Sequence, residues 1–273
     1  MSPNRGSFRV LSVLTWAIIA LIWSVLPLVF LARGSDPSPE LAAAETAYAE
    51  AIGLSKSDPT AARAGFERAA ELYAAVPRAS AGTPAALHFN HANALVQAGR
   101  TGEAIAEYRA ALKRAPADER VAHNLAEARA RVAGRGAEPP APGALERAAA
   151  FWGVASEPMR WLLAVVLAWT AFGLAAASKE SRAAARTIAV GAVLVASTVG
   201  LDLIRRATDR AGVFDAPALV RKGNGDGFEP LFVEPLPEGT ECRIAETRPG
   251  WIRIELADTS TGWVRDDAVI RVP

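Results

Sequence analysis

The chain has 273 residues, and its 30 Lys and Arg side chains nearly balance 29 Asp and Glu side chains, for a net charge of +1. That balance supplies no field that would attract a polyanion, which argues against nucleic-acid binding. The one cysteine, Cys242, excludes an intramolecular disulfide and a cysteine-rich zinc site. The apolar fraction of 51% is high for a soluble chain, and the excess lies in three long stretches.

The first of these stretches, residues 10–32, holds no charge over 23 positions. As a helix it is long enough to cross a hydrocarbon core of about 30 Å. Arg5 and Arg9 before it would also suit a cleaved signal peptide. The stretch is longer than the apolar part of most signal peptides, however, and FLA before Arg33 is a poor cleavage site. We therefore predict an N-terminal transmembrane anchor or signal segment over residues 1–33, with retention as an anchor favoured.

Residues 39–134 carry helical periodicity with a repeated spacing. Within this region, AALHFNHANALVQAGRTGEAIAEYRAALKRAPAD (85–118) contains two amphipathic helices around a Gly99-Arg100 turn. The pattern resembles a tetratricopeptide repeat, and the matching positions are Leu95, Gly99, Ala104, Tyr108, Ala111 and Pro116. His88 and His91 depart from it, since Trp and Leu are usual there.

A single repeat cannot bury its own apolar face, so neighbouring helices are expected. Upstream, a helix over 39–54 precedes a second helix that contains Ala62, Phe66, Ala69 and Ala70. Downstream, residues 120–132 read as the first helix of a further repeat that would cap the array. We predict about two repeats plus this capping helix, followed by a Pro- and Gly-rich linker over 135–144.

The resemblance implies protein binding along the face that the first helices of the repeats form. The residues that the family pattern assigns to that face, with Arg120 at its edge, are Phe89, Asn93, Gln97, Arg120, His123, Asn124 and Glu127. Asn and Arg side chains there could hold backbone or carboxylate groups of an extended ligand. The alternative, that these are solvated polar positions on a packing module, stays open.

The histidines raise a metal hypothesis that we do not adopt. His88 and His91 lie on one helix and His123 on the next first helix, and three histidines can ligate zinc. No acidic residue or fourth ligand is fixed near them, and substituted repeat positions explain them equally well. We predict no metal and no cofactor. The sequence also lacks a phosphate loop, GxSxG, HExxH or paired catalytic carboxylates, so we expect no catalytic residues and no enzyme.

Two further apolar stretches lie at 161–178 and 187–204. We therefore predict a juxtamembrane helix and a two-span transmembrane hairpin over residues 145–205. Lys179, Arg182 and Arg186 crowd the short loop between the two stretches, which favours a cytoplasmic loop. The repeats and the C-terminal tail would then both lie outside the cytoplasm. Basic residues after the second stretch weigh the other way.

After Gly212 the apolar pattern changes to period two, which predicts short β-strands over 241–245 and 251–256. Residues 212–273 resemble a bacterial SH3-like domain through Leu219-Val-Arg, Leu236-Pro-Glu-Gly-Thr, Pro249-Gly-Trp-Ile-Arg-Ile and Thr261-Gly-Trp-Val. The resemblance implies a small all-β barrel. In this barrel Cys242 would be a small core residue rather than a nucleophile.

The fold class is therefore a multidomain membrane protein with an α-helical repeat array, transmembrane helices and an SH3-like barrel. This order of parts resembles the BatE-type proteins of bacterial Bat (aerotolerance) operons. The resemblance implies a non-catalytic scaffold in the bacterial inner membrane that works beside a MoxR-type AAA+ ATPase and von Willebrand factor A-domain membrane proteins. The alternative is a cell-wall sensor or anchor whose SH3-like domain binds peptidoglycan.

Overall fold

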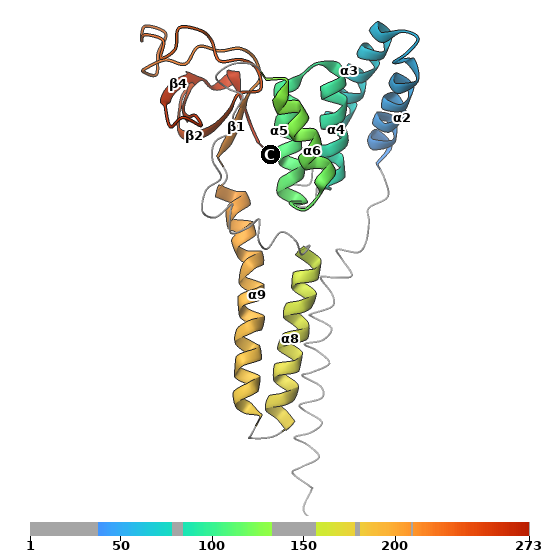
Figure 1. Cartoon of the computed structure of the whole chain (residues 1–273), viewed down its shortest axis with the longest axis vertical. Helices are drawn as coiled ribbons and strands as arrows, with labels where there is room; N and C mark the ends of the chain where they lie inside the picture. The colour runs from blue at the N-terminus through green and yellow to red at the C-terminus, as the bar shows by residue number, and fades with distance from the viewer. Residues whose placement is uncertain (1–37, 78–83, 133–156, 178–180, 209, 273) are drawn as a thin grey trace, which may run out of the picture. The chain divides into compact units, whose positions relative to one another are not determined.

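The computed structural model describes residues 38–77, 84–132, 157–177, 181–208 and 210–272 (Figure 1). The chain divides into two compact units, one that contains residues 155–202 and one that contains residues 37–154 and 203–273. The predicted anchor over residues 1–33 and the predicted linker over 135–144 lie outside the described residues, as does the start of the predicted juxtamembrane helix.

Five helices form a layered array, in which consecutive helices pack side by side (Figure 1). Their bounds are α2 (Pro39–Leu54), α3 (Pro59–Ala75), α4 (Ala85–Ala98), α5 (Thr101–Arg114) and α6 (Glu119–Ala130). Helices α2 and α3 each begin with a proline, preceded by an N-cap side chain, Ser38 or Asp58, that accepts a backbone hydrogen bond. These are the local signals that start a helix, and both helices lie where the repeat pattern predicted them.

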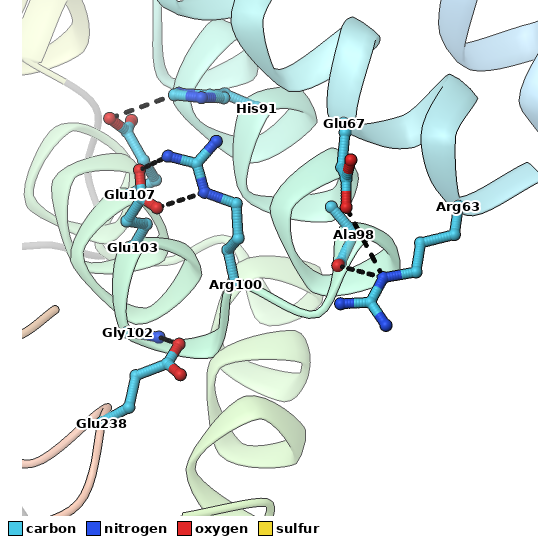
Figure 2. Close-up of polar contacts among 9 residues, drawn as sticks. All are labelled: Arg63, Glu67, His91, Ala98, Arg100, Gly102, Glu103, Glu107 and Glu238. Carbon is cyan, nitrogen blue, oxygen red and sulfur yellow. Dashed lines mark hydrogen bonds and ion pairs between the residues drawn. The ribbon is translucent and has the colours of Figure 1, made fainter. Parts of the chain in front are cut away.

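The turn between α4 and α5 follows the repeat pattern. Gly99 ends α4 in the left-handed region at φ 88°, which a glycine adopts without strain. The Arg63 side chain on α3 donates a 3.0 Å hydrogen bond to the Ala98 carbonyl and so ties the end of α4 to its neighbour (Figure 2). Ala104 and Ala111, both fully buried, let α5 approach the adjacent helices closely, as the repeat pattern predicted.

The C-terminal part forms a five-stranded antiparallel sheet in the order β4-β3-β2-β1-β5. The strands are β1 (Ala211–Phe214), β2 (Glu241–Arg248), β3 (Trp251–Glu255), β4 (Thr261–Arg265) and β5 (Val269–Arg271). The predicted alternation is confirmed, since Ile252 and Ile254 are buried and Arg253 between them is exposed. Strands β4 and β5 are the edges of this sheet, so closure into a barrel stays a prediction.

The sheet packs against the helical array, and several of its residues lie in the array's apolar core. All four residues of β1 are buried: Ala211 and Val213 pack into the helical cluster, whereas Phe214 packs into the core of the sheet itself. Val272 also joins the helical cluster, and Ile270 packs against it. The array and the sheet therefore belong to one compact unit of the chain. The sheet covers α5, and one strand serves both cores because its side chains alternate between its two faces.

The remaining helices are α8 (Glu157–Ala177) and α9 (Arg182–Thr208). Within them, Met159–Ala176 and Arg182–Leu201 are long and apolar enough to cross a membrane. Large apolar side chains such as Leu163, Val166 and Val193 are exposed, while small alanines on both helices are buried. A water-soluble helix pair would bury its large apolar side chains, so this exposure pattern agrees with the predicted transmembrane hairpin.

Candidate protein-binding site

Two of the predicted ligand-facing side chains meet at a tyrosine from the intervening helix. The Tyr108 hydroxyl on α5 donates a 2.6 Å hydrogen bond to Asn93 Oδ1 on α4. Asn124 Nδ2 on α6 donates to the same oxygen at 3.0 Å. Burial raises the pKa of Tyr108 to about 12, so the hydroxyl keeps its proton at neutral pH. A single amide oxygen thus joins three consecutive helices and fixes both asparagines.

An aromatic and a cationic side chain extend this cluster. The Phe89 ring lies 6.1 Å from the Tyr108 ring, centroid to centroid, and the Arg120 guanidinium lies 5.6 Å from the centre of the Phe89 ring. Arg120 also pairs with Asp118 at 2.9 Å, although its side chain is 78% exposed. We call Phe89, Asn93, Arg120 and Asn124 the recognition surface. It offers amide groups, an apolar ring and a positioned cation within one small area.

The other predicted residues do not join this cluster. Gln97 is exposed at the last turn of α4. His123 and Glu127 on α6 pair with each other, with 3.2 Å between His123 Nε2 and Glu127 Oε1, and both side chains are mostly exposed. The structure therefore brings together part of the predicted set and leaves the rest as solvated side chains on the helices.

A buried polar cluster explains the two histidines that depart from the repeat pattern. Glu107 on α5 lies between them, with its Oε2 2.6 Å from His88 Nδ1. Its Oε1 is 3.3 Å from His91 Nδ1 (Figure 2). All three side chains are more than nine-tenths buried. His123 lies elsewhere, and within the described residues no group of His, Cys, Asp or Glu side chains is arranged to hold a metal ion. Glu107 thus gives the Nδ1 atom of each histidine a carboxylate partner between α4 and α5, whereas the buried His88 Nε2 has no hydrogen-bond partner among the described residues.

A second set of buried charges joins the array to the sheet. Glu241 at the start of β2 is only 2% exposed, and its carboxylate binds Arg109 on α5 at 2.6 Å and Arg129 on α6 at 2.5 and 3.1 Å. With period two, Glu241 lies on the face of its strand opposite Cys242, a face that a sheet standing alone would turn toward water. That face proves to be covered by the helices, so the glutamate is buried and needs both arginines.

Close backbone contact supports the same interface. Helix α5 has no side-chain cap of its own, and Glu238 from the turn before β2 accepts a 2.7 Å hydrogen bond from the Gly102 amide in its first turn (Figure 2). A Cβ on Gly102 would lie 2.3 Å from the Phe214 carbonyl oxygen, and one on Gly239 would lie 2.6 Å from a Val132 methyl group. Both glycines are therefore required by the close approach of sheet and helix.

The geometry defines a helical-repeat protein whose first helices present a mixed polar and aromatic surface. Residues 84–128, which include α4, α5 and most of α6, match the family described as Tetratricopeptide repeat. No curated protein and no solved structure matches the chain. The repeat resemblance is thus confirmed for this segment, and repeats of this family serve in protein–protein interaction. The SH3-like and BatE-type resemblances remain predictions.

Proposed function

We propose that this protein is a non-catalytic, membrane-anchored adaptor that binds a protein partner through the recognition surface. The observation that carries the proposal is the network in which Tyr108 and Asn124 bond one oxygen of Asn93. Because both amides are fixed before a ligand arrives, little side-chain entropy is lost on binding.

The unused groups of that network suit an extended peptide. The Asn93 amide nitrogen and the Asn124 amide oxygen take no part in the bonds among the three side chains. They could bond the carbonyl and amide groups of a partner backbone. Arg120, positioned over Phe89, would pair with a carboxylate, and the exposed part of the Phe89 ring would contact an apolar side chain.

The proposed cellular location and partners rest on the order of the repeats, the apolar helices and the sheet along the chain. The two apolar helices support a place in the bacterial inner membrane, and the antiparallel sheet supports an SH3-like tail. Together with the repeats they support a BatE-type role. The partner would then be a von Willebrand factor A-domain membrane protein or a MoxR-type AAA+ ATPase, with the repeats and the tail outside the cytoplasm in the topology that the short basic loop favours.

The test is affinity purification of the full-length protein from detergent-solubilised native membranes, followed by mass spectrometry. The informative variant is Arg120→Glu, because this exposed side chain lies at the first turn of α6, where an acid does not weaken the helix. The matched control is Arg68→Glu, an exposed charge reversal on α3. We expect the Arg120 variant to lose the partner by about tenfold or more, the size of a charge-assisted contact. Equal recovery with both variants would contradict the proposal.

The cell-wall alternative predicts a different result in the same experiment. Wall-synthesis or wall-cleaving enzymes would be recovered, and the full-length protein would sediment with purified sacculi. The Arg120→Glu variant would then behave like the wild type in sedimentation. The full chain is needed for this comparison, because the sheet shares its core with the helices.

A further inference from the structure

A polar cavity of about 370 Å³ lies at the open end of the sheet, where the chain enters it from α9. Strand β1 starts only at Ala211, whereas β2 runs on to Arg248, so the later part of β2 has no β1 neighbour. The register of β2 against β3 also shifts between Ile244 and Glu246. The cavity fills the space that the short strand leaves.

Two arginines line this cavity, one from the residue before β1 and one from the end of β5. Arg210, immediately before β1, donates to the Ala245 carbonyl at 3.3 Å. Arg271, at the end of β5, donates to the Thr247 hydroxyl at 3.2 Å. Each bond uses one of the five N–H groups of a guanidinium. Glu246 also lines the cavity, but Arg248 at 2.7 Å and Arg253 at 3.7 Å from its carboxylate oxygens neutralise it. The site therefore carries a net positive charge.

The geometry points to a site for the phosphodiester of an anionic phospholipid headgroup, held between Arg210 and Arg271. Guanidinium groups bind phosphate oxygens through paired N–H donors, and two such groups match the two unesterified oxygens of a phosphodiester. Thr247 adds a hydroxyl beside them. The cavity is far larger than one phosphate group, which leaves room for the polar remainder of a headgroup.

Chain connectivity selects a lipid over a free anion, an argument that rests on the membrane placement in the proposed function. The apolar window of α9 ends at Leu201, and the helix continues to Thr208. Seven helical residues and two further residues place the Arg210 backbone within roughly 18 Å of the end of the apolar window. Headgroups occupy about 5–8 Å beyond the hydrocarbon core, and arginine side chains extend toward them. Between the apolar window and the sheet, residues 202–210 hold three arginines and two aspartates, a net charge of +1, so the preference for an anionic headgroup rests on Arg210 and Arg271.

The test uses the full-length protein in nanodiscs that contain equal parts of phosphatidylglycerol and phosphatidylcholine, with native mass spectrometry of the lipids that stay bound. The variant is Arg210→Gln with Arg271→Gln. The control is Arg243→Gln with Arg265→Gln, which removes the same charge from exposed positions outside the cavity. We expect the variant to retain about tenfold less phosphatidylglycerol than the control. Equal retention in both would overturn the site.

Three further measurements decide the source of the anion and guard against misfolding. Inorganic phosphate that binds wild-type protein in pure phosphatidylcholine, with no phosphatidylglycerol preference in mixed discs, would overturn the lipid assignment. Extraction of the protein from native membranes by alkaline carbonate would overturn the membrane placement and the lipid assignment together. Stable membrane retention without a preference for phosphatidylglycerol would overturn the proposed phospholipid site but not the membrane placement. The single Arg271→Lys variant keeps the charge but lacks the paired donors, and we expect it to lose part of the preference while keeping the wild-type circular dichroism spectrum.

Discussion

The sharpest test of the fold is Glu241→Ala, because this carboxylate joins the sheet to two helices. The glutamate side chain is 2% exposed, and its partners Arg109 and Arg129 are 19% and 29% exposed. Removing it takes away the contacts with both arginines and leaves two like charges close together at the interface.

The size of the stability loss depends on which charges each substitution leaves without a partner. Breaking a buried ion pair by removal of one partner costs about 3–5 kcal/mol when the remaining charge stays buried. Both arginines reach some water, so we expect about 3 kcal/mol for Glu241→Ala. The variant Arg109→Ala leaves the glutamate with two contacts from Arg129, and we expect only about 1–2 kcal/mol. Substitution of the glutamate should therefore lower the free energy of unfolding more than substitution of either arginine.

Hydrogen exchange of backbone amides, measured on the full-length protein in detergent, reports how readily the interface between the sheet and the helices opens. At about 1.4 kcal/mol per factor of ten, Glu241→Ala should speed the exchange of β1 amides roughly 100-fold, and Arg109→Ala about tenfold. The control is Glu255→Ala, whose half-exposed side chain lies 3.9 Å from Arg243 and should contribute little. The double variant of Glu241 and Arg109 should cost less than the sum of the single variants. Exchange of β1 in Glu241→Ala within threefold of the Glu255 control would refute the docking argument.

The other expectations concern three buried polar groups, Cys242, Glu107 and Tyr108. Burial raises the pKa of Cys242 to about 12 from its usual 9.0, so at pH 8 only about one thiol in ten thousand is a thiolate, and maleimide should label the protein only after unfolding in urea. The folded state holds this thiol proton more tightly than the unfolded state does. The free energy of unfolding should therefore fall as the pH rises from 9 toward 12, which unfolding curves at alkaline pH can show. Glu107→Ala leaves the buried His88 ring without its partner and should lower stability by about 2–3 kcal/mol, measured by exchange of α4 amides; a change below about 0.5 kcal/mol would contradict the pairing. Tyr108→Phe removes one donor to Asn93 and should cost about 1 kcal/mol by the same measurement, less than Glu107→Ala, and the reverse order would contradict this ranking.

The sequence predicted the elements whose signals are local. The repeat positions Gly99 and Tyr108 and the apolar positions Ala62 and Phe66 of α3 follow from turn geometry and helix periodicity, which act over a few residues. The alternation in β3 identified its buried face for the same reason. All four members of the recognition surface were among the predicted residues, because the repeat pattern indicates which helix positions face outward; the pattern did not separate them from Gln97, His123 and Glu127.

The contacts between distant segments were not predicted. Arg109 and Glu241 are separated by 132 positions, and no periodicity in either segment indicates the other. Period two assigned Glu241 to the face opposite Cys242, but it cannot tell water from a covering helix. Glu107 was missed for a similar reason. A useful signal was present, since His88 and His91 occupy apolar repeat positions, and buried polar groups require a partner.

The docking of sheet on helices also constrains how the chain crosses a membrane. The array ends before α8 and the sheet begins after α9, yet residues of both lie in one apolar core. Two segments that share a core must lie on the same side of a bilayer, so the chain between them must cross it an even number of times. Two helices of spanning length meet that condition, and one spanning helix with one peripheral helix does not. A reporter of membrane side fused after residue 273 and one inserted after Ser57 should therefore always agree. Opposite sides for the two reporters would refute the shared core or the two-span hairpin.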